Sequence, residues 1–212
     1  MLYALIPVKA LDGAKSRLAD VLDGVARRAL VIAMYRDALA AAVACPALDG
    51  VAMVSGDEDA LALAETAGAE PMREPGGLNE ALTSASKTLA GRGVDRLLVL
   101  FADLPLVNAD AIERVARSNA DVALVSPDDG GTNALVLAPG VINFQFGPDS
   151  AAKHVAAAER AGLGVVQLDE PSLALDIDTP EDLEQARQGS GVAKHTLAVL
   201  AQIGESPVVE RR

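Results

Sequence analysis

Cationic and hydroxyl side chains gather directly after an apolar run at the start of the chain. Lys9, Lys15 and Arg17 fall within nine residues, and Ser16 stands between the last two. Fixed cations at this density offset the charge of phosphate oxygens, so the loop could hold a triphosphate. Neither GxxxxGK[ST] nor GxGxxG is present, which excludes the usual glycine-rich phosphate loops. Taken without its neighbours, the segment is equally compatible with a solvated charged loop.

Three aspartates form a second group of residues that could take part in chemistry. Asp103 directly follows the apolar run 96–102, whereas Asp176 and Asp178 stand two residues apart, which places both carboxylates on one face of an extended segment. Carboxylate oxygens are the ligands that Mg²⁺ prefers, so together they predict a site for Mg²⁺ carried by a nucleotide. Two alternatives stay open: an ordinary helix-capping loop at Asp103, and capping of the helix that begins at Pro180 by one of the other two.

Two glycine-containing loops supply neutral polar groups. In residues 128–133 the glycines let backbone amides approach a ligand beside Thr132, although a hairpin turn has the same composition. Gly147 and Ser150 stand at the start of a predicted helix, where free amides favour anions. His154 lies one turn further on the same helix face, where a lone histidine is commonly a solvated surface residue.

The elements that must position these residues alternate between short apolar runs and longer helical stretches. Strands are expected at residues 2–8, 50–55, 70–73, 96–102, 122–126, 132–137 and 165–169. Helices are expected at residues 23–44, 57–67, 78–89, 108–118, 149–161, 180–188 and from 192 onward. This alternation predicts a mostly parallel central sheet flanked by helices, an α/β fold that binds ligands beyond the carboxyl ends of its strands.

The amino-acid composition excludes several classes of function. The 212 residues carry 18 Lys plus Arg and 30 Asp plus Glu, a net charge of −12, and only 3 Phe, 2 Tyr and no Trp. Such a chain lacks the positive charge and the stacking platforms of nucleic-acid binders, and its core must be aliphatic. One cysteine, Cys45, excludes a disulfide framework or a cysteine-cluster metal site. With no signal-peptide pattern and no apolar stretch of about 18 residues, we expect a cytoplasmic protein that does not contact membranes.

The order of these motifs resembles the 2-phospho-L-lactate guanylyltransferase family of coenzyme F420 biosynthesis. The resemblance rests on PVKALDGAKSRLA, DLP, GGTNAL, FGPDSAAKH and LDIDTPEDL, and it extends from about Ile6 to Leu183. The opening loop and FGPDS are its specific parts, whereas DIDTPEDL also resembles nucleotidyltransferases in general. The resemblance implies a single-domain, Rossmann-like fold of the nucleotide-diphospho-sugar-transferase type, with the nucleotidyltransferase domain at 1–190 and a C-terminal helix and tail at 191–212. The apolar helix from Val192 to Ile203 could serve a homodimer contact.

The resemblance also implies an activity and roles for residues. Family members move GMP from GTP to phosphoenolpyruvate, 2-phospho-L-lactate or 3-phospho-D-glycerate and release pyrophosphate. By position, the nucleotide-binding residues are Lys9, Lys15, Ser16, Arg17 and Asn79. The residues that bind the phosphorylated acid are Thr132, Gly147 and Ser150, with His154 beside them. The residues that bind Mg²⁺ are Asp103 and Asp178, with Asp176 as a neighbour. Lys15 and Arg17, supported by Lys9, would stabilise the transferring group.

Two other functions remain open from the sequence. DIDTPEDL would also suit a cytidylyl- or guanylyltransferase that acts on another acceptor, such as a molybdopterin cofactor. The second alternative is a non-catalytic nucleotide-binding module. The sequence leaves open which three-carbon acid is the acceptor, and the preference for guanine rests on the resemblance.

Overall fold

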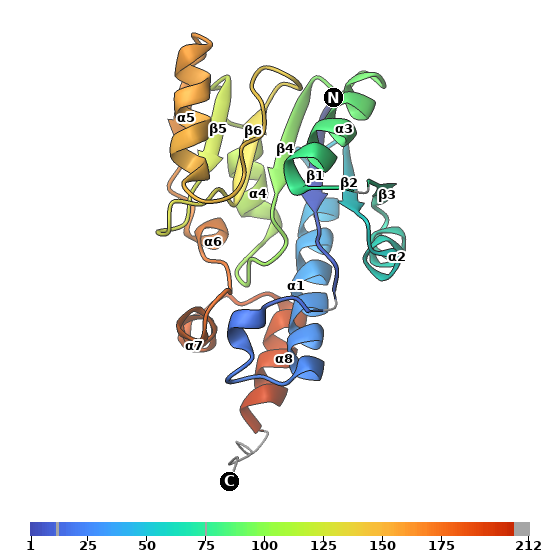
Figure 1. Ribbon diagram of the computed structural model, residues 1–212, viewed down its shortest axis with the longest axis vertical. Coiled ribbons are helices and arrows are strands. Elements are labelled where there is room, and N and C mark those ends of the chain that lie inside the picture. The colour runs from blue at the N-terminus through green and yellow to red at the C-terminus, as the bar shows by residue number, and fades with distance from the viewer. Residues whose placement is uncertain (12, 75, 206–212) are drawn as a thin grey trace.

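One mixed sheet forms the centre of the molecule (Figure 1). The computed structural model describes residues 1–11, 13–74 and 76–205. Within them the strands are β1 (Leu2–Pro7), β2 (Gly50–Ser55), β3 (Glu70–Arg73), β4 (Arg96–Leu100), β5 (Val122–Val125), β6 (Ala134–Leu137) and β7 (Val165–Gln167). Their order is β3-β2-β1-β4-β6-β5-β7, and β6 runs antiparallel to both of its neighbours while the other pairs are parallel. The predicted α/β class and mostly parallel sheet are confirmed.

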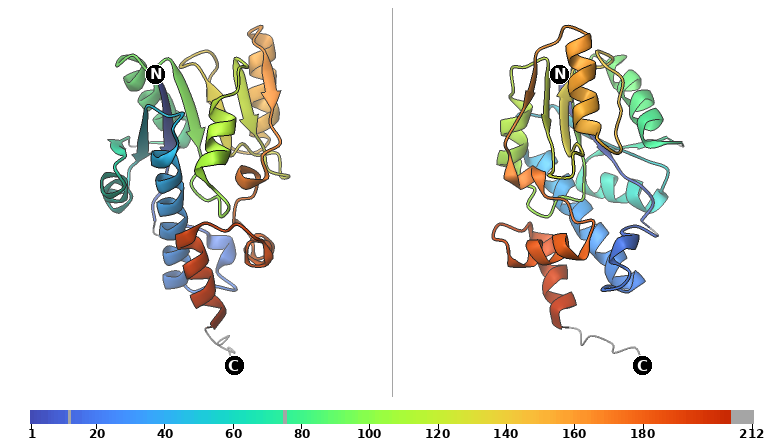
Figure 2. Two further views of the ribbon diagram at one scale, coloured as in Figure 1. Left: turned by 180° about the vertical axis from the view of Figure 1, so that it is seen from behind. Right: turned by 60° about the vertical axis from the view of Figure 1, so that its left-hand side comes forward.

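Helices cover both faces of this sheet. They are α1 (Gly24–Ala44), α2 (Glu58–Ala67), α3 (Leu78–Ala90), α4 (Ala109–Ala116), α5 (Ser150–Arg160), α6 (Pro171–Ala174), α7 (Pro180–Gln188) and α8 (Lys194–Glu205), with a 3₁₀ helix at Ser16–Leu18. α3 and α5 lie on one face, and α1, α2 and α4 lie on the other (Figure 2). The short α6 and the 3₁₀ helix are not expected from the sequence, because one or two turns show no periodicity to detect.

The strands alternate their side chains between two apolar clusters, one for each face. Leu5 and Val99 join the cluster under α3 and α5, whereas Ile6 and Leu98 join the cluster under α1, α2 and α4. A central strand that is buried on both faces must be apolar throughout, which is why the run 96–102 is so hydrophobic. The final residues of that run leave the strand and become part of the cavity wall described below.

Local signals fix the helix ends as the sequence predicts. The Asp23 side chain accepts a hydrogen bond from the Ala26 amide, at 2.8 Å, and so caps α1. Thr179 caps α7, which has Pro180 at its first position. Gly68 ends α2 with a φ of 83°, a left-handed conformation that glycine adopts without strain.

The C-terminal helix α8 lies along α1, below the sheet (Figure 2). Asp37, a buried carboxylate on α1, accepts hydrogen bonds from the His195 amide at 3.0 Å, the Thr196 amide at 2.7 Å and the Thr196 hydroxyl at 2.8 Å. Leu200 is buried in the core, and Val199 packs against it. Leu197 on the same helix is exposed, so the expected homodimer contact through this helix stays a prediction.

No helix in the described part of the chain is both long enough and apolar enough to cross a membrane. α1 has the necessary length, with 21 residues, but its sequence includes Arg27, Arg28, Arg36 and Asp37.

Asp37→Asn should destabilise the protein by about 1–3 kcal/mol, because the amides at the start of α8 lose a charged acceptor in a buried setting. Urea unfolding measures the change. Asp20→Asn, at an exposed carboxylate before α1, is the matched control and should stay within about 0.5 kcal/mol of the wild type. Equal stability of the two variants would mean that Asp37 does not anchor α8.

Candidate functional site

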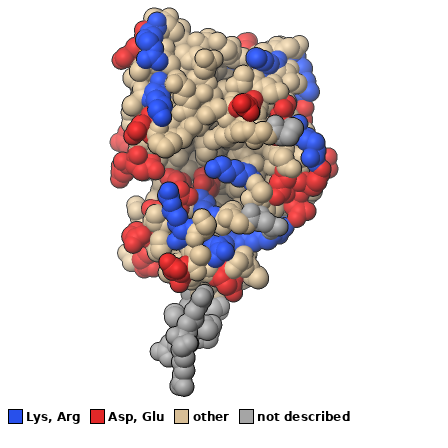
Figure 3. Space-filling view, viewed as in Figure 1, with Lys and Arg blue, Asp and Glu red and all other residues tan. Residues whose placement is uncertain are grey.

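A cavity of about 1040 Å³ opens where the parallel strands end. Its walls come from the segments after β1, β2, β3, β4 and β5, the starts of α3 and α5, and the segment between α6 and α7. Figure 3 shows this face hollowed, with lysine and arginine side chains along the lower part of the hollow. This position agrees with the prediction that the ligand lies beyond the carboxyl ends of the strands, and the volume suits two small substrates.

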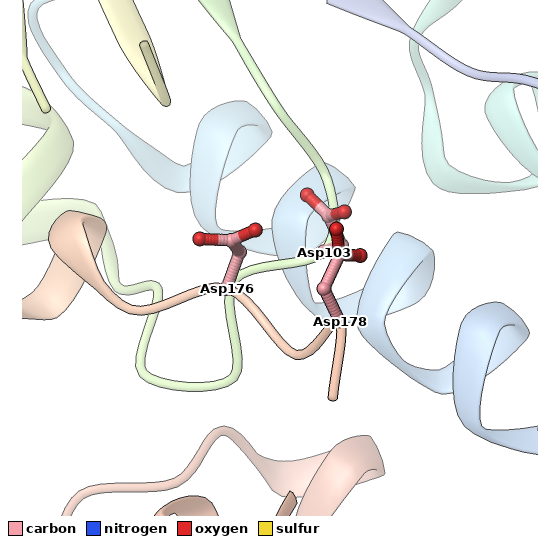
Figure 4. A group of neighbouring side chains, drawn as sticks. All are labelled: Asp103, Asp176 and Asp178. Atoms are coloured by element: carbon pink, nitrogen blue, oxygen red, sulfur yellow. The ribbon is translucent and has the colours of Figure 1, made fainter. Parts of the chain in front are cut away.

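The three predicted aspartates meet in this cavity (Figure 4). Asp103 follows β4, whereas Asp176 and Asp178 belong to the segment between α6 and α7. One oxygen from each carboxylate lies within 4.8 Å of the others, so the cluster could hold a divalent cation. Burial, and then the negative charge of Asp103, raise the pKa of Asp176 to about 6.

Hydrogen bonds between distant segments hold this cluster in place. The Ile177 amide donates to the Asp103 carbonyl, at 3.2 Å, which joins the two segments. The Asn133 side-chain amide donates to Asp176 Oδ1, at 3.4 Å. Asp182 Oδ2 accepts from the amides of Asp178, at 3.0 Å, and Thr179, at 2.7 Å. The cap of α7 is Thr179 with Asp182, so the alternative in which Asp176 or Asp178 caps this helix is wrong.

Lys15 places its ammonium between two of the three carboxylates. Its Nζ atom lies 2.6 Å from Asp103 Oδ2 and 2.7 Å from Asp178 Oδ1, and its side chain is 9% exposed. Burial by itself would lower the pKa of Lys15, but Asp103 and Asp178 outweigh burial and raise it, so the group stays charged. Burial would likewise raise the pKa of Asp178, and Lys15 outweighs it and lowers that pKa. The carboxylate cluster is therefore arranged around a cation.

The backbone of Lys15 is strained to reach this place. Its φ of 54° lies in the left-handed region, which costs an ordinary residue about 1–2 kcal/mol. The two charge-assisted hydrogen bonds offset this cost.

The other residues of the opening loop lie further out. Lys9 is exposed and lines the cavity. Arg17 is 73% exposed, and its nearest nitrogen is 3.7 Å from Asp178 Oδ2. Ser16 is exposed at the start of the 3₁₀ helix, and neither Ser16 nor Arg17 lines the cavity. The structure thus brings Lys9 and Lys15 to the cavity, and the nucleotide-binding roles of Ser16 and Arg17 stay predictions.

Thr132 and Ser150 meet on the opposite wall. Their hydroxyl oxygens are 2.9 Å apart, and the two residues are 4% and 1% exposed. The loop 126–133 is a hairpin between β5 and β6 and also lines the cavity, so both interpretations of that loop hold. The expectation of free amides at the start of α5 is wrong at two positions, because Ser150 N donates to the Gly147 carbonyl and Ala151 N to that of Gly130. The side chains of Thr132 and Ser150, with those of Asp129 and Asn133, are the polar groups that line this wall.

His154 lies behind these two hydroxyls and is fully buried, so the interpretation as a solvated surface residue is wrong. Its Nε2 atom accepts a hydrogen bond from the Gln145 amide at 3.0 Å. Burial lowers the pKa of His154 to about 4, so the neutral ring carries its proton on Nδ1 and donates to Thr132 Oγ1, at 3.2 Å. The hydroxyls of Thr132 and Ser150 share the 2.9 Å hydrogen bond, in which either oxygen can be the donor. His154 does not line the cavity and acts as a positioning residue.

Asn79 ties the two walls together. Its side-chain nitrogen donates to the Phe146 carbonyl at 3.1 Å, and its oxygen accepts from the Phe146 amide at 2.8 Å. The structure thus places Asn79 as a clamp between α3 and the loop before α5, and its side chain does not line the cavity. Its predicted contact with the nucleotide is untested.

All three phenylalanines of the chain gather at this clamp. The Phe101 and Phe146 ring centroids are 5.2 Å apart, and those of Phe144 and Phe146 are 5.9 Å apart. The His154 ring meets Phe146 edge-on, with the centroids 4.8 Å apart. The core is therefore mainly aliphatic, as predicted, and the aromatic side chains concentrate beside the cavity.

Tyr35 is a cavity residue that the sequence analysis missed. It lies on α1, is 8% exposed and lines the cavity. Burial, and then Asp103, raise the pKa of Tyr35, so its hydroxyl stays protonated and can donate a hydrogen bond. The available signal was a single tyrosine among the small and aliphatic residues of the buried face of α1.

Comparison with known proteins relates the whole chain to one group. Residues 2–207 match the family described as Guanylyl transferase CofC like. A phosphoenolpyruvate guanylyltransferase from Rubrobacter xylanophilus is 43% identical over 202 residues, which cover 90% of this chain and 95% of the relative. One from Sphaerobacter thermophilus is 41% identical over 187 residues, or 86% and 90% of the two chains.

Solved structures of lower sequence similarity share the fold. A nucleotide-diphospho-sugar transferase structure from Desulfovibrio desulfuricans G20 has a TM-score of 0.76 and 22% identity, and the match covers 95% of this chain and 94% of that one. A 4-diphosphocytidyl-2C-methyl-D-erythritol synthase has a TM-score of 0.62 and 15% identity, over 88% and 96% of the two chains. The predicted nucleotide-diphospho-sugar-transferase-like fold is confirmed.

Lys15→Met should raise the affinity of the aspartate cluster for a divalent cation about tenfold, because no ammonium then has to leave two carboxylates. Isothermal titration of the protein with MgCl₂ or MnCl₂ measures this affinity. Lys87→Met, at an exposed lysine on α3, is the control and should bind as the wild type does. An unchanged or weaker affinity in Lys15→Met would show that the ammonium does not compete with the cation.

His154 should make folding stability depend on pH in a defined window. The unfolded histidine, with a pKa of about 6.5, takes up a proton before the folded one, with a pKa of about 4, so stability falls as pH decreases between these values. Relative to His154→Gln, the wild type should lose about 2–3 kcal/mol between pH 7 and pH 4.5 in urea unfolding. Asp176 titrates in both proteins and cancels in this comparison. A constant difference at the two pH values would mean that His154 is not buried in its neutral form.

Proposed function

The chain belongs to the Guanylyl transferase CofC-like family, and from this premise we propose that it transfers GMP from GTP to phosphoenolpyruvate in coenzyme F420 biosynthesis. The observation that carries the proposal is the cluster of Lys15, Asp103 and Asp178, which lies in a cavity between two walls of different composition. Family membership decides against the non-catalytic module and against a transferase for molybdopterin. The acceptor follows the names of relatives about 40% identical to this chain.

The cavity offers separate places for the two substrates. The nucleoside wall consists of small and apolar residues together with two carboxylates, namely Ser55, Gly56, Asp57, Glu74, Gly76, Gly77 and Leu78. The acceptor wall includes Thr132, Gly147 and Ser150, and Asp129, Asn133 and Phe146 also line the cavity on this side. Lys9 and Lys15 lie between them, after β1, where they suit the phosphates that the two substrates bring together.

Asp103, Asp176 and Asp178 would hold Mg²⁺. Three carboxylates offer hard oxygen ligands within reach of one another, and the Lys15 ammonium between two of them indicates a place built for positive charge. Bound there, Mg²⁺ would neutralise charge on the nucleotide phosphates. The predicted homodimer and cytoplasmic location are parts of this proposal that await measurement.

The transfer of GMP needs no nucleophile from the protein, and the residues of the cavity suit a direct reaction between the two substrates. The acceptor's phosphate oxygen is ionised at neutral pH, so its attack on the α-phosphorus of GTP needs no general base. A P–O bond forms there, and the bond between the α-phosphorus and the oxygen bridging to the β-phosphorus breaks, which releases pyrophosphate. Lys15 and Lys9 offset the charge of the meeting phosphates, Ser150 and Thr132 orient the acceptor, and Phe101 and Phe146 limit access of water.

Incubation with GTP, MgCl₂ and phosphoenolpyruvate should give guanylylated phosphoenolpyruvate and pyrophosphate, identified by mass spectrometry. Parallel reactions with 2-phospho-L-lactate and 3-phospho-D-glycerate determine the preferred acid. Asp103→Asn should fold normally and lose at least about 100-fold in turnover, whereas Asp110→Asn, at an exposed carboxylate on α4, should not. Absence of a guanylylated product with every acid would refute the proposed function.

Ser150→Ala should raise KM for the acceptor about tenfold or more, because a charged acceptor oxygen loses a hydrogen-bond donor worth about 1–3 kcal/mol. KM for GTP should change much less. Steady-state kinetics with each substrate varied in turn measure both values. Equal changes in the two KM values would place Ser150 at the nucleotide and exchange the two walls.

A further inference from the structure

The nucleoside wall contains a carboxylate that the mechanism does not use. Glu74 follows β3, and its amide donates to the Ser55 carbonyl, at 3.2 Å, which fixes its backbone beside the end of β2. The strand order puts β2 and β3 on the opposite side of β1 and β4 from the acceptor wall. With the triphosphate at Lys9 and Lys15, after β1, the base of the nucleotide extends toward Glu74.

Glu74 differs from the other carboxylate on this side of the cavity. Asp57 uses both oxygens within the protein, since Oδ1 accepts from the Ala60 amide at 3.1 Å and Oδ2 from the Leu11 amide at 2.9 Å. Glu74 Oε1 accepts from the Ser84 hydroxyl at 2.9 Å, which orients the carboxylate. Its Oε2 atom accepts no hydrogen bond from any residue that the structure describes, so it is available to a ligand.

We propose that Glu74 recognises the guanine base, with its carboxylate accepting hydrogen bonds from the N1–H and the 2-amino group. This inference rests on the proposed function, because it takes GTP as the nucleotide. Guanine presents these two donors side by side, and an ionised carboxylate offers acceptors only. Gly76 and Gly77, which lack side chains beyond Cα, and the apolar Leu78 leave room for a flat ring beside this carboxylate.

The same carboxylate discriminates against the other nucleotides. Adenine and cytosine carry an unprotonated ring nitrogen beside their amino group, so a lone pair would face the carboxylate. A site built for a given hydrogen bond rejects a ligand that lacks the matching donor more strongly than an apolar pocket rejects a change of size. Glu74 thus supplies a physical basis for the preference for guanine, which in the sequence rests on the family resemblance alone.

The test exchanges the hydrogen-bond pattern of Glu74 with little change in its shape. Glu74→Gln has one donor and one acceptor, which suits xanthine, where a carbonyl replaces the 2-amino group. Binding of GTP, XTP and ITP, each with MgCl₂, is measured by calorimetry without any acceptor. We expect Glu74→Gln to lose about 100-fold in affinity for GTP and to bind XTP at least tenfold more tightly than the wild type does. In the wild type, ITP, which lacks the 2-amino group, should bind more weakly than GTP.

Two variants serve as controls. Glu65→Gln changes an exposed glutamate on α2 that does not line the cavity, and its nucleotide preference should equal that of the wild type. Ser84→Ala removes the hydroxyl that orients Glu74 but keeps the carboxylate, so it should weaken GTP about fivefold and gain no affinity for XTP.

The outcomes separate this inference from the proposed function. Tighter XTP binding by Glu74→Gln supports the inference, and a misfolded variant could not produce it. Unchanged GTP preference in that variant overturns it, even if the wild type transfers GMP normally. A wild type that binds GTP but guanylylates no acid overturns the proposed function, while the binding comparison still decides on Glu74. A wild type that binds none of the three nucleotides overturns both.

Discussion

The arrangement of the cavity depends on the compensation of negative charge by the buried ammonium of Lys15. Asp103, Asp176 and Asp178 come from two segments that are far apart in sequence, and three carboxylates at such short separation repel one another. Lys15 joins Asp103 to Asp178 and thereby draws the opening loop, the end of β4 and the segment before α7 to one point. A chain with a net charge of −12 thus keeps a local place for positive charge where phosphates must enter. The left-handed backbone of Lys15 shows that this contact is strong enough to hold the loop in a strained conformation.

A neutral network has the corresponding role at the acceptor wall. His154, Thr132 and Ser150 are all nearly inaccessible to solvent, and two hydrogen bonds join them in a chain. Because the histidine is held in its neutral form, it contributes direction without adding charge. The Asn79 clamp on Phe146 keeps the loop before α5 at a constant distance from α3. The two regions of the cavity therefore differ: one contains ion pairs, and the other contains a chain of neutral hydrogen-bonded groups.

Local sequence signals predicted most of the fold, because apolar runs, caps and glycine stops act within a few residues. The strands around residues 50–55 and 70–73 have the predicted bounds, and Thr179 caps the predicted helix. The site was predicted as a set of residues after strand ends, and Lys9, Lys15, Asp103, Thr132 and Ser150 do share one cavity. The pairing of Lys15 with Asp178, the burial of His154 and the clamp at Asn79 were not predicted. The Lys15 pairing and the Asn79 clamp join residues more than 60 positions apart, and the burial of His154 depends on what covers its helix face. Contacts of this kind leave no periodic signal in the sequence.

The antiparallel strand β6 has a consequence for how this architecture can diversify. Because β6 runs against its neighbours, it begins at the same edge of the sheet at which β4 and β5 end, and the hairpin loop 126–133 projects there. That loop carries Thr132 together with Asp128 and Asp129, but it contains neither Lys15 nor any of the three clustered aspartates. Insertions or exchanges in this surface hairpin can therefore change one side of the cavity without altering the cluster of Lys15 and the three aspartates. The reversed strand thus presents part of the cavity wall on a separate loop, on which natural variation or laboratory evolution can act without rebuilding the charged cluster.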